Sequence, residues 1–311
     1  MEYDLEYLAR THGFNIREIE KVCRIFDILE DISNVKFLGE RLSLYGGTAL
    51  NFIYFKDIPR LSIDLDFNYR HRDAKDWGEV RDEVDERIKQ ILYMRGYKKS
   101  DLNINSSYPL CRMDVSYQSS LGIRDSFVIE VGYMRRYSVL KSDAIADFMH
   151  MGKEERFKIL TPTLEELFAN KFGACLYRAT SRDIYDVYRI AEMKFDVNTF
   201  RKCVVIDCLM RGKPALIEIN VSDTIGKVSL DTTLKNLLRT EGADRVNFQN
   251  IKQQVIKFSE SVLENLHEKE IMLIKEFYEK KQFRPEVIDD KSQFHDKLRE
   301  HPAILRALEK L

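Results

Sequence analysis

The segment that most constrains this chain is LSIDLDFNY (residues 61–69), in which apolar and polar side chains alternate strictly. Residues two apart on a β-strand point to the same face, so Ser62, Asp64 and Asp66 share one face and the apolar residues share the other. The apolar face predicts packing on a core. The polar face sets two carboxylates roughly 6–7 Å apart, where like charges repel unless a cation lies between them. The segment therefore predicts either a divalent-cation site or a solvated strand face.

A glycine pair precedes this strand. The segment LSLYGG (42–47) is typical of a short strand, and TALNFIYF (48–55) is typical of a short helix that follows it. Gly46 and Gly47 allow positive φ and a close backbone approach to a phosphate, while a helix N-terminus offers free N–H groups and a positive dipole end. The turn predicts a phosphate cradle or, alternatively, a plain strand-to-helix turn with Thr48 as the N-cap.

The two features are close enough in sequence to act together. Only 14 residues separate Gly47 from Ser62, which suits a short helix and a return to a neighbouring strand. We expect the glycine turn and the carboxylate face to lie at one end of the same sheet. Arg60 and Ser62 would then add phosphate contacts beside the cation.

The rest of the chain predicts an α+β protein with a mixed sheet flanked by helices, followed by a mainly helical region. Gly96 and Gly122 are expected to end a helix and to join a hairpin. We expect a domain of residues 1–160 that contains the sheet and a helical domain of residues 161–311. The expected helices span 15–32, 76–97, 163–177, 181–194, 198–211, 249–282 (as one or two) and 292–310, the further strands span 111–118 and 126–134, and 214–247 is less regular.

Composition excludes several classes of protein. The formal net charge of the 311 residues is -1, so nucleic acid could be held only by local basic patches, and solvated surface charge is an equal alternative for each. The clusters are Arg135-Arg136, Arg178-Arg182 and Arg211-Lys213. The N-terminus has no apolar run and no segment reaches membrane-spanning length, which predicts no signal peptide and no membrane partner. Five cysteines without a CxxC pair predict reduced thiols in a cytoplasmic protein.

A lysine lies on the apolar stripe of the helix expected at 163–177. Lys171 follows that stripe at i+3 and i+4 spacing, so its ammonium must either reach a carboxylate or extend outward to solvent. On the next helix, Asp183 and Asp186 lie three apart and share a face. Asp183 has a structural explanation as a first-turn acid that helps to cap the helix. Asp186 lies further in and is the expected partner of Lys171.

Phosphoryl transfer with two metal ions needs a third acid on a neighbouring strand. Glu130 lies in FVIEVGY and Asp114 lies in CRMDVSY, both among apolar neighbours. Either could complete the site, and either could instead face solvent or pair with Arg112 or Arg124. If neither faces the site, the chain would bind one metal ion rather than two.

The sequence resembles the AbiEii/AbiGii toxin family, which includes the mycobacterial MenT toxins and has the DNA polymerase β-like nucleotidyltransferase fold. GGTAL followed by R-x-S-x-D-L-D-F resembles the family signature, and so does a later K…R…RD-x-YD pattern. FRPEVI (283–288) and HPAIL (301–305) resemble its closing segments. The matching residues are Gly46, Gly47, Thr48, Ala49, Leu50, Arg60, Ser62, Asp64, Leu65, Asp66, Phe67, Lys171, Arg178, Arg182, Asp183, Tyr185 and Asp186.

The resemblance implies transfer of a nucleoside monophosphate from a nucleoside triphosphate to an acceptor such as the 3′ end of a tRNA. It implies a toxin of a type IV-like toxin–antitoxin system with a separate antitoxin protein. Asp64 and Asp66 would hold Mg²⁺, with Mn²⁺ as an alternative, and the resemblance favours Glu130 as their third acid.

The nucleotide would contact Gly46, Gly47, Thr48, Arg60, Ser62 and Lys171, and Asp186 would be an essential acid that orients Lys171. The alternatives are phosphate transfer to a protein, a non-catalytic nucleotide- or RNA-binding module, and a metal-dependent nuclease.

Overall fold

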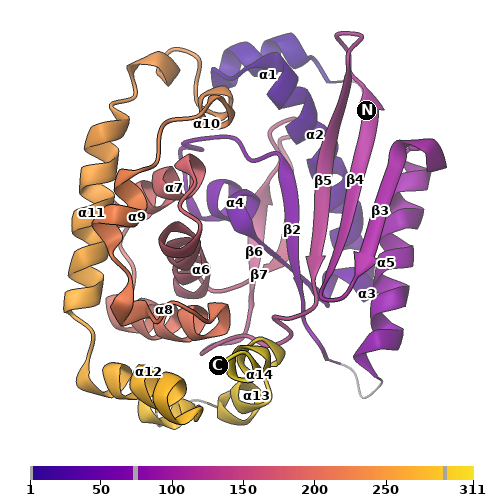
Figure 1. Cartoon of the computed structure of the whole chain (residues 1–311). Coiled ribbons are helices and arrows are strands. Elements are labelled where there is room, and N and C mark those ends of the chain that lie inside the picture. Colours follow the sequence, from indigo (N-terminus) through magenta and orange to yellow (C-terminus); the bar gives the residue numbers. More distant parts are fainter. Residues whose placement is uncertain (1–2, 73–75, 290–292) are drawn as a thin grey trace. The chain divides into compact units, whose positions relative to one another are not determined.

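The computed structural model describes residues 3–72, 76–289 and 293–311 and divides into two compact units (Figure 1). Unit 1 comprises Met1–Arg136, Asp143–Pro162 and Lys235–Asp244, and unit 2 comprises Tyr137–Ser142, Thr163–Leu234 and Arg245–Leu311. The chain passes from unit 1 to unit 2 after Arg136 and again after Pro162, and segments 143–162 and 235–244 return to unit 1.

Unit 1 is built on a five-stranded mixed sheet with the strand order β1-β2-β5-β4-β3 (Figure 1). β2 runs parallel to β5, and the other neighbouring pairs are antiparallel. The strands are β1 (Leu42–Tyr45), β2 (Asp64–Tyr69), β3 (Leu102–Ser107), β4 (Leu110–Gln118) and β5 (Arg124–Gly132). This arrangement confirms the predicted α+β class, the mixed sheet and the hairpin that turns at Gly122, where φ is +74°.

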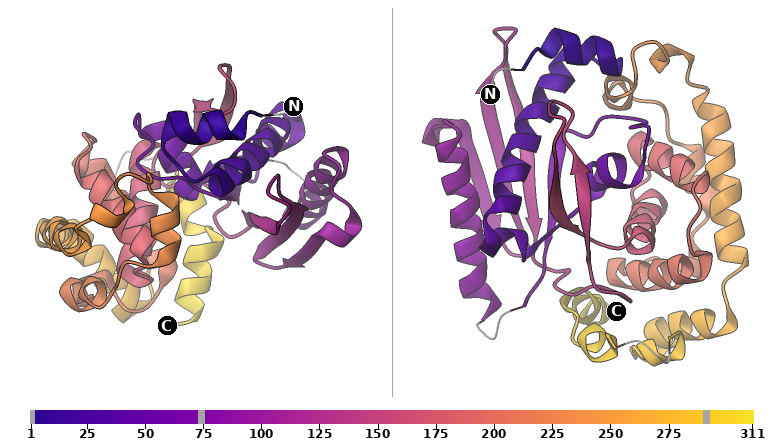
Figure 2. Two further views of the ribbon diagram at one scale, coloured as in Figure 1. Left: turned by 90° about the horizontal axis from the view of Figure 1, so that it is seen from above. Right: turned by 180° about the vertical axis from the view of Figure 1, so that it is seen from behind.

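One face of the sheet is apolar and forms the core of unit 1. Leu65, Phe67, Ile129 and Val131 are fully buried, whereas the acids Asp64, Asp66 and Glu130 that alternate with them are only partly buried. α2 (Ile16–Asn34) and α5 (Trp77–Met94) contact each other and lie on the same side of the sheet (Figure 2). Each fully buried aliphatic or aromatic side chain contributes about 1.5–3 kcal/mol, so this face stabilises the sheet while the other face stays available for polar groups.

The remaining elements of unit 1 are short. They are α1 (Leu5–His12), α3 (Lys36–Gly39), α4 (Gly46–Ala49), the π-helix η1 (Leu50–Tyr54), the 3₁₀ turn η2 (Lys99–Asp101), and a second, two-stranded sheet of β6 (Ala144–Met149) and β7 (Arg156–Thr161). The sequence patterns did not predict β3, β6 or β7. β3 has the sequence LNINSS, and each of its residues is exposed or only half-buried. It forms a strand because its backbone pairs with β4, not because of a hydrophobic pattern.

Unit 2 is helical apart from its loops, as predicted for residues after 161. The expected helices appear as α6 (Leu164–Tyr177), α7 (Ser181–Ala191), α8 (Val197–Arg211), α11 (Phe248–Glu264) and α12 (Glu268–Lys280). The irregular region contains η3 (Leu216–Glu218), α9 (Val221–Gly226), α10 (Thr232–Leu237) and η4 (Ala243–Arg245). Within α10 and within η4 the assignment changes from one unit to the other. η5 (Pro285–Val287) follows α12.

The helix expected at 292–310 is two helices, α13 (His295–Arg299) and α14 (Pro302–Glu309), and residue 292 itself lies outside the described residues. Pro302 lies in the first turn of α14, where a backbone N–H has no partner within the helix, so the missing N–H of proline costs nothing. In the middle of one continuous helix the same proline would remove a hydrogen bond, which explains why there are two helices. Within residues 3–72, 76–289 and 293–311, no helix combines the length and apolar character needed to cross a bilayer.

Candidate functional site

The glycine turn is packed directly against the second aspartate of the Ser-x-Asp-x-Asp strand. β1 ends at Tyr45, and Gly46 has a φ of +73°, a conformation that residues with a side chain rarely adopt. A Cβ atom at Gly46 would lie 2.2 Å from Oδ2 of Asp66, far inside van der Waals contact. Only glycine therefore allows this backbone turn and this carboxylate to occupy adjacent space.

The second glycine is packed against the other two polar groups of the signature. A Cβ atom at Gly47 would lie 2.6 Å from Oγ of Ser62 and 2.9 Å from Nη2 of Arg60. Both side chains are buried, with Ser62 7% and Arg60 2% exposed, and Nη1 of Arg60 donates to the carbonyl of Leu61 at 2.8 Å. The structure thus brings together the turn and the strand that the sequence predicted to be neighbours.

Asp64 and Asp66 share one face of β2, as the alternation predicted. Both are half-buried, whereas Leu65 between them is fully buried. In the sheet register Asp66 pairs with Tyr45 of β1 on one side and with Glu130 of β5 on the other. Laterally paired residues in neighbouring strands point to the same face, so Asp64, Asp66 and Glu130 all belong to the polar face of the sheet.

The turn begins earlier than predicted, which changes the role of Thr48. α4 starts at Gly46 rather than near Thr48, and its N-cap is Tyr45, so Thr48 is not the N-cap. The Thr48 side chain is fully buried and its hydroxyl donates to the backbone carbonyl of Asp64 at 2.6 Å. This hydrogen bond joins α4 to the first residue of β2. It gives Thr48, which was predicted to contact nucleotide, a structural role.

Asn51, which the sequence patterns did not single out, is bound to the backbone of the glycine turn. Its amide Nδ2 donates to the carbonyl of Gly47 at 2.8 Å, and the side chain is fully buried. It belongs to η1, and π-helical turns occur disproportionately at functional sites. The available signal was its spacing, because a residue four positions after Gly47 faces that carbonyl one helical turn later.

The two acids proposed as the third carboxylate are both held by one arginine. Arg112 of β4 donates from Nη1 to Glu130 at 2.6 Å and from Nη2 and Nε to Asp114 at 2.7 and 3.1 Å. In the part of the chain that the structure describes, no three His, Cys, Asp or Glu side chains form a group able to hold a metal ion. The metal set Asp64, Asp66 and Glu130 therefore stays a prediction.

Lys171 and Asp186 form a buried ion pair inside unit 2. Nζ of Lys171 lies 2.8 Å from Oδ2 of Asp186, and the two side chains are 10% and 1% exposed. The apolar stripe of α6 places the lysine inward, and α7 supplies the carboxylate, so the predicted pairing is confirmed. Removing either partner would leave a buried charge without its counterion.

Asp183 has the structural role predicted for it. Its carboxylate accepts hydrogen bonds from the backbone N–H and hydroxyl of Thr180 and from Arg178, which completes a capping box at the start of α7. Burial by itself would raise the pKa of Asp183, but the hydrogen bond from Arg178, the charge of Lys171 and the hydrogen bond from Thr180 lower that pKa to about 2.

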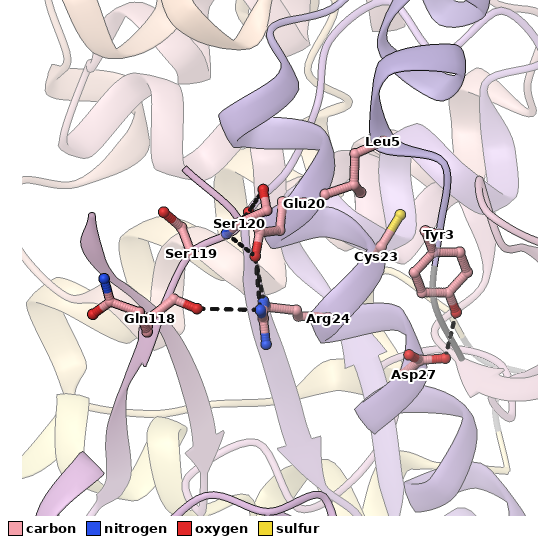
Figure 3. A pocket seen from close by; sticks show the side chains of 9 residues that line it. All are labelled: Tyr3, Leu5, Glu20, Cys23, Arg24, Asp27, Gln118, Ser119 and Ser120. Atoms are coloured by element: carbon pink, nitrogen blue, oxygen red, sulfur yellow. Dashed lines mark hydrogen bonds and ion pairs between the residues drawn. The ribbon is translucent and has the colours of Figure 1, made fainter. Parts of the chain in front are cut away.

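Unit 1 also contains a pocket that includes none of the predicted site residues (Figure 3). Its volume is about 360 Å³, and it is lined by Tyr3, Leu5, Glu20, Cys23, Arg24, Asp27, Gln118, Ser119 and Ser120. The polar side chains are directed at one another, since Glu20 accepts from Arg24 and Ser120 and Tyr3 donates to Asp27. The charged groups of this pocket already have partners within unit 1.

The chain resembles proteins of known family and fold. A family model described as "Nucleotidyl transferase AbiEii toxin, Type IV TA system" matches residues 27–271, a range that includes every predicted site residue. No curated protein sequence matches the chain significantly. Among solved structures it is similar to MenT4, a nucleotidyltransferase toxin of Mycobacterium tuberculosis H37Rv, with a TM-score of 0.63 and 18% identity over 98% of this chain and 99% of that one. This likeness supports the nucleotidyltransferase fold.

Proposed function

The chain belongs to the AbiEii family of nucleotidyltransferase toxins, and on that premise we propose that it transfers a nucleoside monophosphate from a nucleoside triphosphate to an RNA hydroxyl, such as the 3′ end of a tRNA. The observation that carries this proposal is the packing of Gly46 against Asp66. It joins a turn able to admit phosphate oxygens to a strand that presents two carboxylates on one face.

The donor set fits a divalent cation of the Mg²⁺ or Mn²⁺ type. Such ions prefer one or two carboxylates together with substrate phosphates, and Asp64 and Asp66 are half-buried acids on one face of β2. When bound, the cation would neutralise charge on the triphosphate and act as a Lewis acid. Asp64 and Asp66 would hold it, and Glu130 is the neighbouring acid able to join them.

The chain's own residues would then position and neutralise the triphosphate. Backbone N–H groups at Gly46 and Gly47, the hydroxyl of Ser62 and the guanidinium of Arg60 would orient the phosphates. Lys171 would stabilise charge that develops on the transferring group, and Asp186 would fix the direction of its ammonium. The acceptor hydroxyl attacks the α-phosphorus and releases its proton to solvent, the α–β phosphoanhydride bond breaks, and pyrophosphate leaves with the bonding electrons.

The partners follow from the same proposal. Family membership supports a cognate antitoxin protein as the binding partner that limits the activity. Basic clusters at Arg135-Arg136, Arg178-Arg182 and Arg211-Lys213 would contribute phosphate contacts to an RNA acceptor. All five cysteines are free and buried, which supports a reducing cytoplasm as the site of action.

The decisive experiment follows the two ends of the triphosphate separately. Purified protein is incubated with total RNA and with each nucleoside triphosphate, labelled at the α- or the γ-phosphate, with Mg²⁺ or with a chelator. Nucleotidyl transfer puts the α-label into RNA and none of the γ-label. Asp64→Asn should reduce labelling roughly a thousandfold, because a bound metal supplies several kcal/mol and each 1.4 kcal/mol is tenfold in rate.

The matched control is Asp147→Asn, which neutralises an exposed strand aspartate paired with Lys158 on β6–β7 of the same unit. It should label RNA as the wild type does. Transfer of γ-label to protein would instead support the kinase alternative, shortening of the RNA would support the nuclease alternative, and no reaction with any nucleotide would support a binding module.

A further inference from the structure

A continuous row of polar residues crosses the sheet at the level of Asp66. The strand register pairs Tyr45 with Asp66, Asp66 with Glu130, Glu130 with Arg112, and Arg112 with Asn105. Laterally paired residues share a face, so this row lies on the same side of the sheet as the predicted cation ligands. Arg112 is the residue of this row that carries a positive charge.

Arg112 connects the two acids that compete for the role of third ligand. Three of the donations from its guanidinium go to carboxylates, with Nη1 on Glu130 and Nε and Nη2 on Asp114. Its side chain is 44% exposed, and those of Asp114 and Glu130 are 36% and 26% exposed. The arginine therefore neutralises both acids on a face that water and ions can reach.

We propose that Arg112 is a built-in counter-cation that competes with a divalent cation for Glu130, so that without nucleotide the site binds its cation through Asp64 and Asp66 while Glu130 is withheld. The inference rests on the proposed function, because it takes the aspartate pair as the cation site. It answers a question that the sequence left open, namely whether a third acid takes part.

Two physical effects give this competition its direction. A cation that recruits Glu130 must first displace Nη1 of Arg112 from the Oε1 atom that it contacts at 2.6 Å. The incoming ion is also repelled by the guanidinium, which remains on the neighbouring strand. Because the pair is partly exposed, the combined effect is modest, and we expect removal of the arginine's charge to tighten cation binding about five- to tenfold.

The test measures Mn²⁺ binding to the full-length protein without nucleotide, from the free Mn²⁺ signal in electron paramagnetic resonance. Arg112→Gln should bind Mn²⁺ about five- to tenfold more tightly than wild type. The control, Arg87→Gln, removes an exposed arginine paired with Glu83 on α5 of the same unit and should leave binding unchanged. Unchanged or weaker binding by Arg112→Gln would overturn the inference.

Double variants identify the acid that the arginine withholds. Arg112→Gln combined with Glu130→Gln should lose the gain, whereas Arg112→Gln combined with Asp114→Asn should keep it. The reverse pattern would overturn the assignment to Glu130. Tight Mn²⁺ binding that Asp64→Asn abolishes, together with no effect of Arg112→Gln, would defeat this inference and leave the proposed function standing. Absence of Mn²⁺ binding in wild type and Arg112→Gln alike would defeat both.

Discussion

The two regions that carry the predicted chemistry hold their charges in opposite ways. In unit 1, Asp64 and Asp66 lie half-buried on a strand whose backbone hydrogen bonds form regardless of those side chains. In unit 2, Lys171 and Asp186 meet at 2.8 Å with side chains 10% and 1% exposed. The two carboxylates on the sheet are partly exposed to solvent, whereas the ion pair between α6 and α7 is buried.

This difference predicts which substitutions lower activity alone and which also lower the free energy of unfolding. Neutralising a partly exposed carboxylate on the sheet would remove one of the proposed cation ligands but leave the apolar face and its packing intact. Removing one member of an enclosed ion pair strands the other in a low-dielectric interior, and the whole helix pair is weakened. Variants of Asp64 and Asp66 should therefore act mainly on activity, and variants of Lys171 and Asp186 on activity and stability together.

The largest expected effect on stability tests this contrast directly. Lys171→Met should lower the free energy of unfolding by about 3 kcal/mol or more, because Asp186 is left buried without its counterion. Urea denaturation followed by circular dichroism measures the change, and Asp66→Asn is the comparison in unit 1, where we expect a shift below about 1 kcal/mol.

A double variant distinguishes the loss of the pair from a general packing defect. Lys171→Met combined with Asp186→Leu should recover a large part of the lost stability, because no charge then remains buried. A double variant as unstable as the sum of the two single variants would show that the charges do not account for the cost. A similar loss for Asp66→Asn would remove the contrast between the two regions.

The next effect concerns the fit of the glycine turn. Gly46→Ala should reduce nucleotide transfer roughly a hundredfold, because displacement of a positioning group by about 1 Å can cost that much, and the new Cβ would lie 2.2 Å from Oδ2 of Asp66. Gly122→Ala is the matched control, since φ is +74° there and a Cβ would meet no atom within 4 Å.

Both alanine variants carry the strain of a positive φ, about 1 kcal/mol, and Gly46→Ala adds the clash with Asp66, so its melting temperature should fall at least as far as that of Gly122→Ala. Only Gly46→Ala should lose activity out of proportion to stability. Equal losses of activity in the two variants would mean that the turn acts through backbone strain rather than through its contact with Asp66.

The smallest effect is a pH dependence that belongs to unit 2. The pKa of Asp183 falls from 3.8 to about 2 in the folded protein. A lowered folded pKa contributes stability that is present above the unfolded value and is lost as the pH falls towards the folded value. Asp183 should thus contribute about 2 kcal/mol at neutral pH, lost between about pH 4 and pH 2.

Asp183→Asn removes this contribution, so its unfolding free energy should fall less steeply than that of wild type over that interval. Urea unfolding at pH 4, 3 and 2 checks the slope. Asp147→Asn, at an exposed surface pair, should retain the wild-type slope. Parallel slopes for wild type and Asp183→Asn would contradict the assignment of this acid to the cap of α7.

Local pattern was sufficient wherever a residue's role depended on its neighbours in sequence. The two-residue period of 61–69 predicted the faces of β2, and the 3.6-residue period of 163–177 placed Lys171 on the apolar stripe of α6. The cap formed by Asp183 and the turn at Gly46 could also be predicted, since each is contained in a few consecutive residues.

Other features had no local signal. β3, β6 and β7 are weakly patterned and exist because a partner strand satisfies their backbone groups. The break before α14 did have a local signal, Pro302, which the helix expected at 292–310 did not take into account. The packing of Asn51 behind Gly47 needed the actual course of the chain through α4 and η1.

The sequence alone was enough to predict the family, the alternating strand with its two aspartates and the pairing of Lys171 with Asp186. Each of these follows from a periodic pattern or from a short motif of nearby residues. Tertiary structure alone decided that Gly46 contacts Asp66, and that Arg112 takes both Glu130 and Asp114. The Gly46–Asp66 and Arg112–Glu130 contacts join neighbouring strands, and the register that aligns those strands is set by the packing of the whole sheet.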